Sequence, residues 1–153
     1  MKSMALNILH IRDSSGLYGS ERVILTLSKH LNKEQFKFIL LCMRRRDGKS
    51  NELISAAFDN GISTFPVDVN GRFDIRAILK IRKYIIKQEI SLIHTHDFKS
   101  DFYGLIASAG LRINRVLTAH GSTRDSLLKR LYLFLDERIL YRCFDRIITV
   151  SHD

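Results

Sequence analysis

The hydrophobic residues of this chain form six short continuous runs, and the segments between the runs repeat their apolar residues every three or four positions. Short runs rich in Ile, Leu and Val are typical of strands that are buried on both faces of a sheet. The predicted strands cover residues 6–12, 36–43, 63–67, 91–95, 115–119 and 146–150. The intervening segments predict helices, so strand and helix alternate along the chain.

Residues that favour helix ends set the helix boundaries. Ser20 and Asp74 are the expected N-caps of helices over residues 21–31 and 75–89. Gly61 and Gly110 are expected to end helices that cover residues 51–60 and 98–109. A longer helix is predicted over residues 122–142. The apolar positions expected to face the sheet are Val23, Ile24, Leu27 and Leu31 in the first helix and Ile75, Ile78, Leu79 and Ile86 in the third.

The alternation of strands and helices predicts an α/β fold. We expect one Rossmann-like domain over residues 1–153, a doubly wound parallel sheet of about six strands with helices on both faces. Ligands of such sheets bind outside the carboxyl ends of the strands, near the point where the strand order reverses. Functional residues are therefore expected in the loops that follow the strands.

The first of these loops contains Gly16 and Gly19 between a strand and a helix. Such a loop aims backbone N–H groups at a phosphate or another anion. The spacing is G-x-x-G and lacks the full dinucleotide pattern. Arg44, Arg45 and Arg46 follow the second strand, which suits the 2′-phosphate of NADP but is also typical of a solvated surface run. A tight turn without a ligand is the alternative for the glycines.

Histidines occur near the ends of two further strands. His94 and His96 lie two positions apart, hence on one face of a strand, and could provide two metal ligands. Local spacing specifies no third ligand, so we predict no metal site, with His94 hydrogen-bonded in the sheet and His96 entering a cleft. His120 follows a strand directly, which suits proton transfer or hydrogen bonding to a substrate. A turn histidine bonded to backbone is its alternative.

Charge and composition limit the classes of partner that the chain is expected to bind. The 153 residues carry a formal net charge of +9, which favours an anionic partner. Nucleic acid is disfavoured because zinc-finger spacing is absent and the Phe residues lie in apolar helical faces. A basic stripe predicts either a solvated helix face or contact with an anionic membrane surface. The stripe contains Arg72, Arg76, Lys80, Lys83 and Lys87.

Cysteine usage and hydropathy bear on the compartment. Cys42 and Cys143 show no paired spacing, so neither a disulfide framework nor a thiolate metal site is expected. The sequence shows no signal-peptide core and no apolar segment near the roughly 20 residues that span a bilayer. We expect a cytoplasmic protein that is soluble or peripheral on the inner membrane surface.

Several motifs in this order resemble the N-terminal half of a family-four retaining glycosyltransferase of the GT-B fold. They are Ile8-Leu-His-Ile11, Gly16-Leu-Tyr-Gly19-Ser-Glu-Arg22, Ile93-His-Thr-His96, Leu117-Thr-Ala-His120-Gly121 and Asp145-Arg-Ile-Ile-Thr-Val-Ser151. The resemblance implies two Rossmann-like domains that face each other across a cleft. The N-terminal domain chiefly binds the acceptor, and the C-terminal domain chiefly binds a nucleotide-sugar donor.

The resemblance also implies roles for individual residues. Gly16 and Gly19 match the glycine loop that approaches the donor, and His120 matches the histidine that contacts the transferred sugar at the reaction centre. Arg72, His96 and Arg124 are predicted acceptor contacts on the basis of position. No metal or other cofactor is implied. The predicted partners are a nucleotide-sugar donor, a glycan or glycolipid acceptor and an anionic membrane surface.

The second domain of that family is absent from these 153 residues, and with it the paired glutamates and basic residues that hold the donor. We therefore expect no measurable sugar transfer by this chain alone, because half a cleft supplies little stabilisation of the leaving diphosphate. Two alternatives remain open. One is a non-enzymatic accessory module that completes its cleft with a separate chain, and the other is a fragment of an NADP-binding oxidoreductase.

Overall fold

The computed structural model describes residues 5–14, 16–44, 51–71, 73–119 and 140–150. Its strands are β1 (Leu6–Arg12), β2 (Phe36–Arg44), β3 (Ser63–Asp68), β4 (Ile90–Thr95), β5 (Asn114–Ala119) and β6 (Arg146–Thr149). Its helices are α1 (Gly19–His30), α2 (Asn51–Asp59), α3 (Ile75–Lys87), α4 (Phe98–Ala107) and the short 3-10 helix η2 (Tyr141–Cys143). The predicted alternation is confirmed. Most of the helix predicted over residues 122–142 lies outside the described residues.

All of these strands pair in parallel in one sheet, with the order β3-β2-β1-β4-β5-β6. The first three strands extend the sheet in one direction, and the next three extend it in the other. The order therefore reverses between β1 and β4, which is where a doubly wound sheet opens a crevice at its carboxyl edge. This arrangement confirms the predicted Rossmann-like fold.

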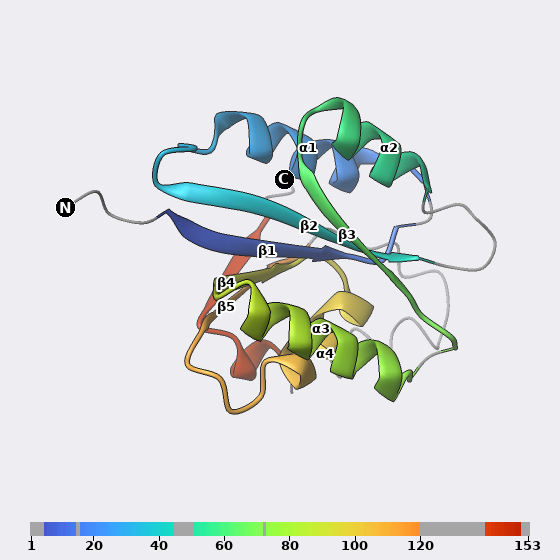
Figure 1. Ribbon diagram of the computed structural model, residues 1–153, viewed down its shortest axis with the longest axis vertical. Coiled ribbons are helices and arrows are strands. Elements are labelled where there is room, and N and C mark those ends of the chain that lie inside the picture. Colours follow the sequence, from blue (N-terminus) through green and yellow to red (C-terminus); the bar gives the residue numbers. More distant parts are fainter. Residues whose placement is uncertain (1–4, 15, 45–50, 72, 120–139, 151–153) are drawn as a thin grey trace.

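Helices cover both faces of the sheet (Figure 1). Helices α1 and α2 lie on one side, and α3 and α4 lie on the other. The side chains of strand β2 alternate between two cores. Leu40 and Cys42 belong to the core beneath α1 and α2, whereas Leu41 and Met43 belong to the core beneath α3 and α4. Because neighbouring side chains point to opposite faces, a strand between two helical layers needs an apolar residue at every position.

Helix α1 is rotated relative to the sequence prediction. Its buried residues are Glu21, Ile24, Leu25 and Ser28. Val23 and Leu27, which were predicted to face the sheet, are exposed. The buried positions lie three, four and seven residues after Glu21, so they share one helix face with that carboxylate. The N-cap is Tyr18 rather than Ser20, because the helix already begins at Gly19.

Helix α3 is rotated in a similar way. Asp74 caps it as predicted, since its carboxylate accepts hydrogen bonds from the backbone N–H groups of Arg76 and Ala77. The face on the sheet consists of Ala77, Ile78, Ile81 and Ile85. The predicted core residues Ile75, Leu79 and Ile86 are 72%, 53% and 56% exposed. The helix therefore turns an apolar ridge, and not only its basic residues, toward solvent.

Strand β6 differs from the expectation of a strand buried on both faces. Each of its residues is exposed, and Ile147 and Ile148 are 43% and 47% exposed. The strand lies at one end of the sheet order and pairs only with β5 among the described strands. The apolar sequence of β6 therefore does not indicate that this strand is buried.

Candidate functional site

One arginine, Arg12, connects the elements that meet where the strand order reverses. Arg12 ends β1, and its guanidinium donates through Nε to Glu21 at 2.8 Å and through Nη2 to the Ser20 hydroxyl at 2.8 Å. Nη1 of Arg12 donates to the backbone oxygen of His96 at 2.8 Å and lies 3.5 Å from the Asp97 carboxylate. One side chain thus joins the end of β1, the start of α1 and the turn that follows β4.

Glu21 is the anionic partner of Arg12 and is completely buried. Its carboxylate also accepts hydrogen bonds from the Ser14 and Ser20 hydroxyls and from the Tyr18 backbone N–H, at 3.0–3.1 Å. Burial raises the pKa of the Glu21 carboxyl, but the adjacent Arg12 charge and these hydrogen bonds outweigh burial and leave the pKa below its ordinary value. The glycine loop is therefore wrapped around a buried, ionised carboxylate.

The two glycines of this loop have different surroundings. Gly16 is buried, and a Cβ atom there would come within 2.9 Å of the Tyr18 ring. Gly19 is exposed at the first position of α1, and a Cβ atom there would meet nothing within 4 Å. The space around Gly19 is open to an approaching ligand.

Backbone N–H groups of the glycine loop donate to acceptors of the protein itself. The Gly16 N–H donates to the Ser14 hydroxyl at 3.2 Å, and the Leu17 N–H donates to the Glu52 carboxylate of α2 at 3.2 Å. The next N–H, of Tyr18, donates to the Glu21 carboxylate, so the consecutive amides of Leu17 and Tyr18 both contact carboxylates. The loop has the polarity expected of an anion-binding turn, with acidic side chains as its acceptors in this structure.

The turn after β4 is clamped to the turn after β1 by a second carboxylate. Asp97 caps α4 by accepting a hydrogen bond from the Ser100 N–H at 2.9 Å, and its other carboxylate oxygen accepts one from the Asp13 N–H at 2.9 Å. Lys99 forms an ion pair with the Asp13 carboxylate at 3.5 Å. Desolvation raises the pKa of Asp97, and the positive charge of Arg12 opposes this effect. Both turns at the reversal of strand order are therefore fixed by charged hydrogen bonds.

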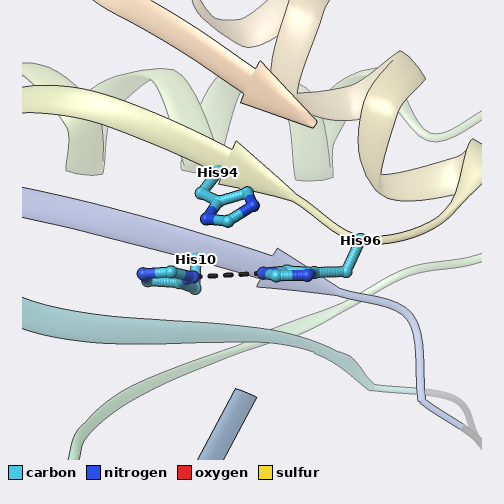
Figure 2. Close-up of side chains that lie close together, drawn as sticks. All are labelled: His10, His94 and His96. Carbon is cyan, nitrogen blue, oxygen red and sulfur yellow. Dashed lines mark hydrogen bonds between the residues drawn. The ribbon is translucent and has the colours of Figure 1, made fainter. Parts of the chain in front are cut away.

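Three histidines cluster just inside this edge of the sheet (Figure 2). His10 of β1 lies opposite His94 of β4 in the parallel ladder, and His96 follows β4. Nδ1 of His10 and Nε2 of His96 are 3.1 Å apart, and Nε2 of His94 is 2.7 Å from the Thr118 hydroxyl oxygen of β5. His10, His94 and His96 are only 2%, 7% and 2% exposed.

The environment of His10 favours the neutral imidazole. Its ring stacks on Phe38 with a centroid separation of 3.9 Å. Burial lowers the pKa of His10 well below its ordinary value, and His94 lowers it further. A strand residue was predicted for His94, and its hydrogen bond to Thr118 agrees with that interpretation. His96 points toward His10 in Figure 2.

Sequence reasoning missed His10 as a member of this cluster. It lies far from His94 and His96 in the chain, and only the pairing of β1 with β4 brings the three rings together. The available signal was the doubly wound strand order, which places the first strand beside the fourth. Of the other predicted site residues, Gly16 and Gly19 lie in the glycine loop at this edge. Arg72, His120 and Arg124 lie outside the described residues.

The arginine run after β2 is only partly described. Arg44 donates through Nε and Nη2 to the carboxylate of Asp68 at the end of β3. These hydrogen bonds hold the pKa of Asp68 below its ordinary value. Arg45 and Arg46 lie outside the described residues. The described arginine is therefore paired with the protein's own acidic residue at the surface.

Comparison with known proteins gives a relative of known activity. The chain is 26% identical over 158 residues to a UDP-Gal:alpha-D-GlcNAc-diphosphoundecaprenol alpha-1,3-galactosyltransferase of Escherichia coli, a match that covers 97% of this chain and 39% of the relative. Among the described residues, no helix is both long and apolar enough to cross a membrane.

Two solved bacterial structures have the same fold. HepE of Anabaena, in complex with UDP and glucose, matches with a TM-score of 0.65 and 16% identity over 91% of this chain and 36% of that protein. MurG of Acinetobacter baumannii matches with a TM-score of 0.66 and 14% identity over 97% of this chain and 42% of that protein. The chain thus spans about two fifths of the length of these relatives.

The family comparison covers most of the chain. The family model described as Glycosyltransferase Family 4 matches residues 18–153. The matched region begins within the glycine loop and includes the Glu21, His94 and His96 positions. The chain therefore belongs to Glycosyltransferase Family 4, as an N-terminal domain of that family.

Proposed function

We propose that this chain is the acceptor-side domain of a retaining glycosyltransferase. The enzyme moves a sugar from a nucleotide-sugar donor to a lipid-linked or polysaccharide acceptor. The observation that carries the proposal is the glycine loop, which Arg12 and Glu21 anchor at the reversal of strand order in a chain of this family. A loop that buried charged hydrogen bonds hold at the carboxyl edge suits recognition of a phosphorylated donor, because a pre-positioned polar site binds at a lower ordering cost.

The proposed reaction assigns a task to each predicted residue. Gly19 has no side chain and leaves space for the donor at the start of α1, and Gly16 lets the loop lie close against the Tyr18 ring. His120, which directly follows β5 in the sequence, contacts the transferred sugar. Arg72, His96 and Arg124 contact the acceptor, with the two guanidinium groups suited to a diphosphate or another anionic group.

Helix α3 favours a lipid-linked acceptor over a free polysaccharide. The exposed apolar side chains Ile75, Leu79 and Ile86 lie beside the basic side chains Arg76, Lys83 and Lys87 on the outer face of this helix. Phe73, just before the helix, is 71% exposed. Apolar and basic groups together favour contact with an anionic bilayer, at about 1 kcal/mol for each basic side chain near the surface. The domain would then act at the inner membrane surface, where a lipid-linked acceptor is held.

Transfer is proposed to need more than these residues. In the family, the groups that hold the donor diphosphate belong chiefly to a second domain. The developing charge on the leaving diphosphate needs preorganised electrostatic stabilisation, which a single side of a cleft supplies poorly. We expect the 153-residue chain to bind acceptor without forming product from a nucleotide sugar.

The test is a binding titration with a short-chain analogue of GlcNAc-diphosphoundecaprenol. We expect saturable binding that weakens about tenfold in Arg124→Ala and Arg72→Ala, the loss of one charge-assisted contact in each. Arg22→Ala is the matched control, because Arg22 is exposed on α1 and has no proposed contact with acceptor. Equal weakening in all three variants, or no binding by the parent chain, would contradict the proposal.

The same preparation separates the two alternatives. Binding of NADPH without binding of the acceptor analogue would favour the oxidoreductase fragment. Product formation from a UDP-sugar by the chain alone would contradict the expected need for further groups. Activity that appears only after addition of a purified second Rossmann-like chain would favour the accessory module.

A further inference from the structure

The histidine cluster at the carboxyl edge has the form of a three-nitrogen ligand set. One ring nitrogen from each of His10, His94 and His96 lies within 4.8 Å of those of the other two. Two of the ligands occupy opposite positions on adjacent strands, and the third lies two residues further along the same face of the chain. Positions on paired strands hold side chains in a fixed relation, which is what a metal site requires of its ligands.

We propose that His10, His94 and His96 bind one divalent transition-metal ion, with Zn²⁺ as the physiological candidate. Imidazole nitrogen suits Zn²⁺, Co²⁺, Ni²⁺ and Cu²⁺ among divalent ions, whereas Mg²⁺ and Ca²⁺ prefer oxygen ligands. Three histidines with a fourth position for water or another ligand is an established zinc arrangement in proteins. The site shares His96 with the proposed acceptor contacts, but metal binding itself is measured without sugar transfer.

The separation of two of the ligand nitrogens, from His10 and His96, is close to that around a bound ion. Zinc–nitrogen bonds of 2.0–2.1 Å in a tetrahedral site place two ligand nitrogens about 3.4 Å apart. Nδ1 of His10 and Nε2 of His96 are 3.1 Å apart. A metal ion would take the place of the proton shared between these two nitrogens after their separation widens by a few tenths of an ångström.

The third ligand already has a supporting contact. Nε2 of His94 is 2.7 Å from the Thr118 hydroxyl oxygen, which assigns Nδ1 of His94 to the metal. Histidines that bind metals usually donate their other ring N–H to an oxygen acceptor, which fixes the ring orientation. Thr118 is buried on β5, beside β4, so this positioning contact comes from the rigid sheet. The hydroxyl acts on the metal only through His94.

Such an ion would connect β1 to β4 at the reversal of strand order. It would link the strands beneath the two clamped turns that flank the candidate crevice. If the ion binds the folded state and not the unfolded state, it raises the midpoint of thermal unfolding by mass action. Stabilisation by the metal is therefore a readout that does not depend on sugar transfer.

The experiment uses the 153-residue chain after removal of any histidine tag, stripped of metal and titrated with Co²⁺ and Zn²⁺. We expect one equivalent of Co²⁺ to bind, with intense visible absorption of a tetrahedral site, and Zn²⁺ to displace it and raise the thermal midpoint. Absence of stoichiometric binding at micromolar metal, or the weak absorption of a six-coordinate ion, would overturn the proposal.

Single substitutions locate the site. His94→Gln and His96→Gln should each weaken Co²⁺ binding at least tenfold, and Thr118→Val should weaken it by about tenfold through loss of the orienting contact. His30→Gln is the matched control, because His30 is exposed on α1 and its Nδ1 contacts the Thr26 backbone oxygen. Circular dichroism checks that each variant is folded. Full affinity in a folded His94→Gln variant, or equal loss in His30→Gln, would overturn the assignment.

Discussion

At the residue scale, the buried carboxylate of Glu21 determines the geometry of the glycine loop. Glu21→Gln leaves the Arg12 guanidinium with a neutral partner in a largely buried position. Breaking one partner of a buried ion pair costs several kcal/mol because the remaining charge stays desolvated. We expect the free energy of unfolding to fall by about 3 kcal/mol at pH 7. Urea unfolding measures this change, with Glu34→Gln as the exposed control.

The effect of Glu21 should also depend on pH. Its pKa in the folded chain is below the ordinary value of 4.5, so the unfolded chain binds the proton more tightly. The stabilisation is therefore fully present above pH 4.5 and is lost as the pH falls through the lower pKa of the folded state. The difference between the parent chain and Glu21→Gln should shrink below pH 4.5. A difference that grows on acidification would contradict the assigned pair.

At the element scale, α4 approaches the sheet closely because residue 104 is glycine. A Cβ atom at Gly104 would lie 2.9 Å from Cγ2 of Thr95, a buried β-branched side chain with little rotational freedom. Gly104→Ala should destabilise the chain by about 1–3 kcal/mol, despite the higher helix propensity of alanine. Gly19→Ala is the control, since its Cβ meets nothing. A higher midpoint of thermal unfolding for Gly104→Ala than for Gly19→Ala would contradict this packing.

The outer face of α3 supports a separate prediction on membranes. Leu79→Gln combined with Ile86→Gln removes two members of the exposed apolar ridge without changing the buried face. We expect weaker sedimentation with vesicles that contain phosphatidylglycerol, and added salt should weaken binding of the parent chain because basic groups contribute.

Phe58→Gln provides the control for the vesicle experiment. Phe58 is 78% exposed on α2, which covers the opposite face of the sheet (Figure 1). Its loss should leave sedimentation unchanged. If the Phe58 variant loses binding while the α3 double variant keeps it, the membrane contact belongs to the other face.

The positions of the strands and helices were more predictable from the sequence than the orientation of each helix on the sheet. Apolar runs such as that of β2 identify a buried strand wherever it lies, so the six strands were predicted without knowledge of their order. The rotation of α1 was not predictable from apolar spacing, because its buried face includes the charged Glu21. His10 joined the site only through strand pairing, a contact that local spacing does not encode.

At the scale of the whole molecule, the described sheet presents an exposed edge at β6. Ile147 and Ile148 are nearly half exposed on a strand that pairs only with β5 in the described part of the chain. An exposed apolar edge strand favours pairing with another chain. We therefore expect the 153-residue chain to self-associate as its concentration rises, measured as an increase in mean mass by light scattering.

A charge on the β6 edge distinguishes pairing through this strand from general stickiness. Ile147→Lys should shift the chain toward monomer, because a lysine on an edge strand disfavours pairing between sheets. Phe58→Lys adds the same charge at an exposed apolar position of α2 and should leave the mean mass unchanged. Helix α2 contacts β2 and β3, which lie at the other end of the sheet order from β6. Equal shifts in both variants would assign association to net charge and exposed apolar area. A monomeric parent chain at high concentration would exclude association through β6.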